Sequence, residues 1–462
     1  TNFAIRGSIT ITSPAGVGTN KKIWLCESSQ TIAYSIHGSI ANVEIRYSLD
    51  GGSTYPENKI IASSVAIGEV PAGGKNLTYP WTVPVDTSTH TVIKITKLAS
   101  LNVYDESDEF TMRGGLAFTH PLSGERWLAN SPKLIEWNTF GIINYVYIEY
   151  SLNNGANWFF VNDGSPIANT TQNYNWTVPN AISSQAFVKI TDTNDPAATT
   201  TSDMFTIHGA LTLTQPNGQE KFKVGQSDTA TKIKWTMIGP ISGVDLALST
   251  NGQAGTYNAL TTNQQASLLE YQWSVPTNVI SNNCFIRIRD NQDVLVEDFS
   301  DLAFKIMENF SIIAPNGTEK WVVGTANNIT WSSISSPNQT DYAVLKYSIQ
   351  PPYSAWDTIV VQTNNDGDFE WTIPPTISNT CRVRVSDYND DADAFDISDA
   401  DFKIQGAISL TVPVGDEKWG CASQQWIRWS WQGNIAKVDI HYYNGSAWVA
   451  IDEAQGLTNG GE

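Results

Sequence analysis

The sequence predicts an all-β protein made of tandem immunoglobulin-like β-sandwich domains arranged as a stiff rod. A Trp-x-x-Pro motif recurs at intervals of 95, 97 and 98 residues, beginning at Trp81, Trp176, Trp273 and Trp371. Short stretches that alternate apolar and polar residues are separated by Gly, Pro, Asn or Asp about every 8–12 residues. No segment keeps a helical period of 3.6 residues. About seven short strands per repeat of about 98 residues is the size of an immunoglobulin-like sandwich.

Three further landmarks share this period and order each repeat. A proline opens it, a central aromatic residue follows, and a Phe-x-Ile/Met-x-Gly segment closes it. The opening prolines are Pro14, Pro121, Pro216, Pro315 and Pro413, and the aromatic residues are Tyr34, Trp137, Trp235, Trp331 and Trp429. The closing segments begin at Phe3, Phe110, Phe205 and Phe402, while the one at Phe304 lacks the glycine. Because the central aromatic falls in an alternating stretch, we expect it in the core between two sheets.

These landmarks define the domain boundaries. Residues 1–7 read as the last strand of a preceding unit, and residues 407–462 as the first half of unit 5. Between them lie unit 1 (8–114), unit 2 (115–209), unit 3 (210–308) and unit 4 (309–406). Only one or two residues separate the last strand of one unit from the first strand of the next, which favours a stiff rod over flexible beads. We expect the chain to be a segment of a longer array, and complementation of the half unit by a partner chain is the alternative.

Several of these motifs resemble the Kre9/KNH-like Ig-like repeats of secreted and cell-surface proteins. The opening Pro315-Asn-Gly-Thr-Glu-Lys-Trp321, the hairpin Tyr47-Ser-Leu-Asp-Gly-Gly52 and the close Val383-Arg-Val-Ser-Asp387 carry the resemblance, which covers nearly the whole chain. Two departures are Phe222, at the place of Trp321, and Lys97, at the place of Asp387. The resemblance implies a β-sandwich fold and an extracellular, non-enzymatic scaffold or adhesive module.

Composition narrows the partner classes. The 27 Lys and Arg residues face 46 Asp and Glu residues, a net charge of −19 that phosphate backbones and anionic lipid surfaces would repel. We therefore expect no nucleic-acid partner and no membrane insertion, and the chain has no run of 18 apolar residues. Self-association or other surface proteins are the expected partners, with glycans as a further candidate class.

Aspartates crowd the hairpin between the last two strands of unit 4. Dense Asp loops can supply the six to eight oxygens that Ca²⁺ takes, so we predict a calcium site formed by Asp387, Asp390, Asp391, Asp393 and Asp399. Their spacing matches no twelve-residue EF-hand loop, and a solvated, turn-forming hairpin is the alternative. Calcium is the sole cofactor that the sequence suggests.

The four cysteines fall in different units. Cys26 and Cys421 occupy equivalent places, as do Cys284 and Cys381, so no complete unit can form an internal disulfide. We expect free, buried thiols, because cores of this size need no disulfide framework. Interchain bonds through Cys26 or Cys421 are the alternative.

The sequence offers no catalytic constellation. The hairpin Ser151-Leu-Asn153-Asn-Gly155-Ala-Asn-Trp158 resembles the Asp box of sialidase-type propellers, but a propeller repeats every 40–50 residues. We interpret it as a structural turn and expect no enzyme activity. Trp158, Trp356 and Trp448 follow this hairpin in three units, and we expect them to pack there rather than to bind sugars.

The sequence therefore predicts a non-catalytic extracellular structural protein, a tandem-repeat subunit of a surface layer, sheath or filament. An adhesin or carbohydrate-binding module array of a larger secreted protein is the alternative.

Overall fold

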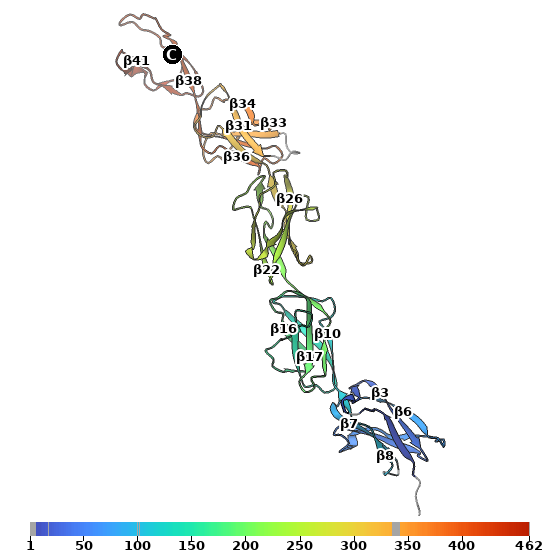
Figure 1. Cartoon of the computed structure of the whole chain (residues 1–462). Coiled ribbons are helices and arrows are strands. Elements are labelled where there is room, and N and C mark those ends of the chain that lie inside the picture. Colours follow the sequence, from blue (N-terminus) through green and yellow to red (C-terminus); the bar gives the residue numbers. More distant parts are fainter. Residues whose placement is uncertain (1–5, 17, 99, 101, 335–341, 462) are drawn as a thin grey trace, which may run out of the picture. The chain divides into compact units, whose positions relative to one another are not determined.

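A computed structural model of the chain describes residues 6–16, 18–98, 100, 102–334 and 342–461. The chain divides into two compact parts, residues 1–210 with 238–241, and residues 211–237 with 242–462. In the described residues the regular structure is almost entirely strand (Figure 1). The exceptions are four single-turn 3-10 helices, η1 (Gly18–Asn20), η2 (Glu57–Lys59), η3 (Ala266–Leu268) and η4 (Asp452–Ala454). None of these helices is long and apolar enough to span a membrane.

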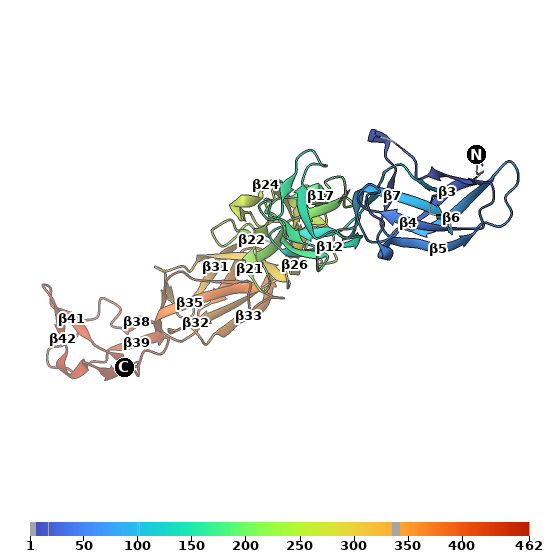
Figure 2. The ribbon, with the colours of Figure 1, turned by 90° about the horizontal axis from the view of Figure 1, so that it is seen from below.

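Unit 1 is a two-sheet sandwich (Figure 2). Its smaller sheet has the order β1-β3-β6, and its larger sheet the order β2-β9-β7-β4-β5 with β8 paired to β7. The strands are β1 (Ser8–Ser13), β2 (Ile23–Leu25), β3 (Ser29–His37), β4 (Asn42–Ser48), β5 (Ile60–Ala66), β6 (Lys75–Thr82), β7 (Ser88–Lys97), β8 (Tyr104–Glu106) and β9 (Phe110–Arg113).

Unit 2 repeats this topology. Its sheets have the orders β10-β12-β16 and β11-β19-β17-β13-β14, with β15 paired to β13 and β18 paired to β17. The strands are β10 (Gly115–His120), β11 (Arg126–Leu128), β12 (Pro132–Phe140), β13 (Tyr145–Ser151), β14 (Phe159–Phe160), β15 (Ile167–Ala168), β16 (Asn173–Thr177), β17 (Ser183–Asp192), β18 (Thr199–Thr201) and β19 (Phe205–His208).

Units 3 and 4 have the same two sheets, in the orders β20-β22-β25 and β21-β28-β26-β23-β24 in unit 3, and β29-β31-β34 and β30-β37-β35-β32-β33 in unit 4. The strands of unit 3 are β20 (Ala210–Gln215), β21 (Lys221–Lys223), β22 (Lys232–Ile238), β23 (Gly243–Ser249), β24 (Tyr257–Gln265), β25 (Glu270–Gln272), β26 (Ser281–Asp290), β27 (Glu297–Phe299) and β28 (Phe304–Met307). Those of unit 4 are β29 (Asn309–Ala314), β30 (Lys320–Val322), β31 (Ala326–Ile334), β32 (Tyr342–Ser348), β33 (Asp357–Asn364), β34 (Asp368–Thr372), β35 (Ser378–Asp387), β36 (Phe395–Ile397) and β37 (Phe402–Gln405).

The first strand of each unit changes sheets at the opening proline. In unit 1, β1 pairs antiparallel with β3 in the smaller sheet, and β2 pairs parallel with the closing strand β9 in the larger sheet. Units 2, 3 and 4 make the same change. The peptide bond before each of the five opening prolines is cis. The opening and closing motifs therefore recur together, because their strands are neighbours in space.

Three aromatic side chains fill one end of each complete sandwich. One comes from the short second strand, one from the Trp-x-x-Pro motif and one from the closing strand. In unit 1, Trp24 lies 5.8 Å from Trp81 and 4.8 Å from Phe110 between ring centroids. The equivalent groups are Trp127, Trp176 and Phe205, then Phe222, Trp273 and Phe304, then Trp321, Trp371 and Phe402. Phe222 thus takes the place of a tryptophan without loss of the cluster.

The central aromatic residues are buried, as the sequence predicts. The Trp137 indole donates its N–H to Asn169 Oδ1 at 2.7 Å, and Trp331 makes the same bond to Asn365 at 2.8 Å. Trp235 donates to the backbone carbonyl of Ala266 at 3.0 Å. Each indole N–H is satisfied, so these large side chains enter the core without an unpaired polar atom. The all-β sandwich prediction is confirmed.

Residues 407–462 form three two-stranded sheets and no complete sandwich. Their strands are β38 (Ala407–Val412), β39 (Arg428–Gln432), β40 (Lys437–Val438), β41 (His441–Tyr443), β42 (Trp448–Ala450) and β43 (Leu457–Thr458). Trp419 is 41% exposed, although its equivalents Trp24 and Trp127 are buried. Large apolar side chains of the kind that the complete units bury are therefore exposed in this part of the chain. At the other end, residues 1–5 of the strand predicted over 1–7 lie outside the described residues.

Candidate functional site

The aspartates of the unit 4 hairpin have four separate tasks. Asp387 ends β35 and is 3% exposed, and its Oδ1 accepts the N–H of Asn389 at 2.8 Å, which closes the turn. Asp192 and Asp290 make the equivalent bond in units 2 and 3. Burial raises the pKa of Asp192 and Asp290, because a charged carboxylate loses solvation there. This first task is local turn formation.

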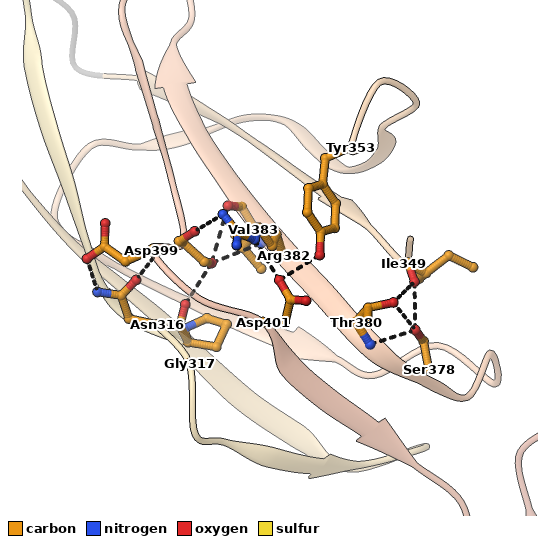
Figure 3. Close-up of polar contacts among 12 residues, drawn as sticks. Asn316, Gly317, Ile349, Tyr353, Ser378, Thr380, Arg382, Val383, Asp399 and Asp401 are labelled. Carbon is orange, nitrogen blue, oxygen red and sulfur yellow. Dashed lines mark hydrogen bonds and ion pairs between the residues drawn. The ribbon is translucent and has the colours of Figure 1, made fainter. Parts of the chain in front are cut away.

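The second task is to hold the opening segment of the unit (Figure 3). Asp399 accepts the side-chain N–H of Asn316 at 2.9 Å, and the Asp399 N–H donates to Asn316 Oδ1. The fully buried Ser398 Oγ accepts the N–H of Val383 at 3.1 Å and donates to the carbonyl of Pro315 at 2.8 Å. We call Asn316, Ser398 and Asp399 the opening clamp. Asn217, Ser300 and Asp301 repeat it in unit 3.

The third task is to form ion pairs across the joint between units 3 and 4. Lys305 Nζ lies 2.7 Å from Asp390 and 2.9 Å from Asp393, and Lys221 Nζ lies 2.6 Å from Asp393. Hydrogen bonds from Lys221 and Lys305 hold the pKa of Asp393 below its usual range. Burial opposes charge on Lys305, yet the two aspartates raise the pKa of its ammonium group. We call the contacts among these four residues the joint ion pairs.

Asp391 is paired within unit 4. It contacts Lys346, Ser386 and Arg384, the last at 3.3 Å. Burial would raise the pKa of Asp391, but hydrogen bonds from Lys346 and Ser386 lower it. This pairing is the fourth task, so each of the five predicted calcium ligands has a protein partner, in four different places.

Across the described residues, no group of three or more His, Cys, Asp or Glu side chains is arranged to hold a metal ion. The predicted ligands are not gathered around one point, and three of them pair with lysines. Calcium binding at this hairpin stays a prediction. Sequence reasoning missed Lys221 and Lys305, because a lysine on a strand of one unit gives no signal that it faces the hairpin of the next.

The joint between units 1 and 2 uses the same loop. Asp195, which stands three residues after the turn aspartate, as Asp390 does in unit 4, lies 2.7 Å from Arg113 Nε on the closing strand of unit 1. The Ile142 N–H donates to the carbonyl of Val85, just after the Trp-x-x-Pro motif, at 2.9 Å. Asn434 makes the matching bond to Pro375 at 3.1 Å, where unit 4 meets residues 407–462.

The joint between units 1 and 2 requires a glycine. Gly141 has φ +77°, and a Cβ atom there would lie 2.8 Å from Cys26 Sγ. A side chain would therefore clash with unit 1 as well as strain the backbone. Cys26 is thus a packing residue of the joint.

The cysteines are free in the structure. Cys26, Cys284 and Cys381 are buried, and Cys421 is exposed. Burial raises the pKa of Cys26 and of Cys284 to about 11, which keeps these thiols protonated and unreactive at neutral pH. Free, buried thiols are confirmed for three of the four.

The hairpin that resembles an Asp box is held by its own hydrogen bonds. Ser151 Oγ accepts the N–H of Gly155 at 2.9 Å, and Asn153 Oδ1 accepts the N–H of Asn157 at 3.0 Å. Unit 1 makes the same bonds through Ser48 and Asp50. These contacts fit a structural turn. The tryptophans behind the hairpin differ, since Trp158 packs beside Lys189 whereas Trp448 is 70% exposed.

No family model and no curated protein matches the chain, so the Kre9/KNH-like resemblance is not confirmed. Solved structures similar to it include the Clostridium thermocellum CbhA fibronectin(III)-like modules, with 16% identity over 43% of this chain and 92% of that one, at a TM-score of 0.16. The N-terminal four Ig domains of Dscam1 isoform 1.9 are 9% identical over 87% of this chain and 100% of that one, at a TM-score of 0.23. The Sidekick-1 immunoglobulin domains 1–5 are 10% identical over 96% of this chain and 88% of that one, at a TM-score of 0.19. Because these TM-scores are low, the fold assignment rests on the strand pairing described above.

Proposed function

We propose that this chain is a non-catalytic extracellular structural protein, a tandem Ig-like segment of a cell-surface assembly such as a surface layer, sheath or filament. The supporting observation is that its recurring polar residues serve the framework and the joints. The turn aspartates, opening clamps and aromatic clusters repeat in several units, as a scaffold under mechanical tension requires. The role is mechanical: cores resist unfolding and joints transmit orientation.

The joints supply the argument for stiffness. A freely jointed array would connect its units by solvated linkers. Here Arg113 and Asp195 link unit 1 to unit 2, and Lys305 links unit 3 to Asp390 and Asp393 of unit 4. Partly buried pairs with two carboxylates around one ammonium restrain the joint more than an isolated surface pair does. We propose that the joint ion pairs set the angle between neighbouring units.

Hydrogen–deuterium exchange of the full chain tests this role of the joint. Lys305→Met should speed exchange at the hairpin around residues 388–394, whereas the sandwich cores should remain protected. Lys232→Met is the matched control, because it removes a lysine that pairs with Glu270 inside unit 3 at 2.6 Å. Equal exchange in both variants would contradict a joint held by these pairs.

Sedimentation velocity tests assembly. A subunit of a surface layer or filament should associate as the concentration rises, and native material should be found outside the cell. Isolated monomers at high concentration, with and without calcium, would contradict the proposal.

Calcium at the unit 4 hairpin is a separate proposal. Ca²⁺ would have to compete with Lys221 and Lys305 for Asp393. A calcium titration followed by thermal melting should raise the midpoint of the wild type and not that of Asp390→Asn. An unchanged midpoint in the wild type would end the idea.

A further inference from the structure

The outward face of the larger sheet of unit 2 carries a row of aromatic side chains. Along β13, Val146 and Ile148 point into the core and are fully buried, so Tyr145, Tyr147 and Glu149 point outward. Phe160 lies opposite Glu149 on the neighbouring strand β14 and therefore shares this face. Tyr145 is 50% exposed and Phe160 47%.

These rings are held in place by their neighbours. Tyr147 and Phe160 lie 5.9 Å apart between centroids. Lys189, opposite Glu149 on β17, bonds that carboxylate at 2.8 Å and places its Nζ 4.4 Å from the centre of the Trp158 ring. We call Tyr145, Tyr147, Trp158 and Phe160, with Glu149 and Lys189, the aromatic face. Because its side chains are already ordered, a ligand would bind with little loss of side-chain entropy.

The sandwich itself does not need these rings. At the position of Tyr147 the other units have Glu44, Asp245 and Val344, by the shared register with the strand that ends at the turn. At the position of Phe160 they have Ile60, Ala259 and Thr358. A residue required by the framework would recur, as the buried aromatic clusters do. Tyr147 and Phe160 are therefore specific to unit 2, whereas Trp158 over Lys189 recurs as Tyr55 over Lys94 in unit 1.

The remaining chemistry of the face distinguishes the ligand class. Besides the rings, to which β17 adds Phe187, the outward side chains of β13, β14, β17 and β18 are hydroxyl, amide or charged, and the adjoining strand β15 adds the small side chain of Ala168. Thr191 and Thr199 Oγ atoms lie 2.8 Å apart beside Tyr147, and Glu149 and Lys189 neutralise each other. The cores of protein-binding patches are enriched in aromatic side chains, Met and Arg and are depleted of Lys and Glu, which occupy this face. An anionic ligand would find no unpaired cation on the face.

A neutral sugar matches this surface. A pyranose presents an apolar C–H face, which packs on the electron-rich face of an aromatic ring, and a rim of hydroxyls. The Glu149 carboxylate can accept two hydroxyl hydrogen bonds, and Lys189 and the threonines can donate. We propose that the aromatic face of unit 2 binds a neutral polysaccharide, with Tyr147 and Phe160, whose planes are inclined by 59°, each stacking on a different sugar ring and Glu149 as the main acceptor. This binding is independent of the mechanical role.

Isothermal titration of the full chain against neutral hexasaccharides tests the proposal. The probes are the hexamers of β-1,4-glucose, β-1,3-glucose, β-1,4-xylose, β-1,4-mannose and β-1,4-N-acetylglucosamine, with polygalacturonate as the anionic comparison. We expect at least one neutral hexamer to bind, and Tyr147→Ala to weaken it at least tenfold. Tyr104→Ala is the matched control, because Tyr104 is a 50% exposed tyrosine on the larger sheet of unit 1 that contacts Lys94.

Glu149→Gln adds a test of chemistry, since it keeps the side-chain shape and should still weaken binding several-fold. Thermal melting of unit 2 confirms that each variant folds. Absence of binding by every neutral hexamer, equal losses in Tyr147→Ala and Tyr104→Ala, or tighter binding of polygalacturonate would overturn the proposal. Sedimentation of Tyr147→Ala should match that of the wild type, so failure here is separable from failure of the structural role.

Discussion

At the scale of the residue, a few buried polar side chains determine how each unit closes. Asp192 and Asp290 end equivalent strands, are almost fully buried and accept a backbone N–H two residues on. Their charge is costly because solvent is excluded, yet their geometry is needed for the turn. An amide side chain offers the same acceptor without the charge.

Asp290→Asn should therefore stabilise unit 3 at neutral pH. Burial raises the folded-state pKa of Asp290, so the wild-type fold binds this proton more tightly than the unfolded chain does. The wild type is then most favoured, relative to Asp290→Asn, below the unfolded-state pKa of about 4, and this advantage is lost as the pH rises through the folded pKa. Urea denaturation of the full chain at pH 3 and pH 7, read by hydrogen exchange of unit 3, measures the difference. Asp163→Asn, at an exposed turn, is the matched control, and equal changes in the two variants would contradict burial as the cause.

The thiols should differ sharply in reactivity. Native chain treated with a thiol reagent at pH 8 should label Cys421 within minutes, whereas Cys26 and Cys284, whose pKa burial raises to about 11, should label only after unfolding. Mass spectrometry of the peptides identifies the labelled site. Rapid labelling of Cys26 in the native chain would show that the joint it packs against opens readily.

At the scale of the element, the opening segment is held to the end of the unit by the opening clamp. The strand changes sheets at a proline, and its backbone groups there find few partners in the sheets. The Ile312 N–H donates to Asp396 at 2.8 Å, and the Ile11 and Leu213 N–H groups donate to Asp105 and Asp298 in the same way. Part of the acidic composition of the closing hairpins therefore serves this change of sheet.

Ser398→Ala should destabilise unit 4 by about 1–3 kcal/mol, because it leaves the buried Val383 N–H and the Pro315 carbonyl each without this partner. The urea midpoint of unit 4, followed by hydrogen exchange of its core strands, measures the loss. Ser354→Ala removes an exposed hydroxyl of the same unit and should change stability by less than about 0.5 kcal/mol. Similar midpoints for the two variants would contradict the clamp.

At the scale of the whole molecule, the joints decide whether the units act together. The joints between units 1 and 2 and between units 3 and 4 each include an ion pair from the hairpin after the turn aspartate, and the first adds a backbone hydrogen bond from Ile142 to Val85. Ion pairs of this kind weaken with salt and with protonation. We therefore expect both joints to loosen at high salt and at low pH.

The joint between units 3 and 4 should loosen in acid. Lysine hydrogen bonds lower the folded-state pKa of Asp393, so its contribution is present above the unfolded pKa of about 4 and is lost as the pH falls through the folded value. Hydrogen exchange at residues 388–394, corrected for the intrinsic rate, should accelerate below pH 4 and in 1 M salt. Lys305→Met should show a smaller acceleration. An unchanged profile in the wild type would exclude these pairs as the restraint.

The sequence by itself determined the strand content, the period of about 98 residues and the buried aromatic frame, because alternation and repeated motifs are local or simply periodic signals. Tertiary structure decided the roles of the acidic residues. Asp390, Asp391 and Asp399 are close in sequence and read as one calcium loop, yet they face a lysine of unit 3, a lysine of unit 4 and Asn316. The partners come from distant strands, and side chains on a hairpin diverge in direction, so spacing along the chain cannot show which carboxylates converge. The same holds for the aromatic face, since only the register of β13, β14 and β17 places its rings and its ion pair on one side of a sheet.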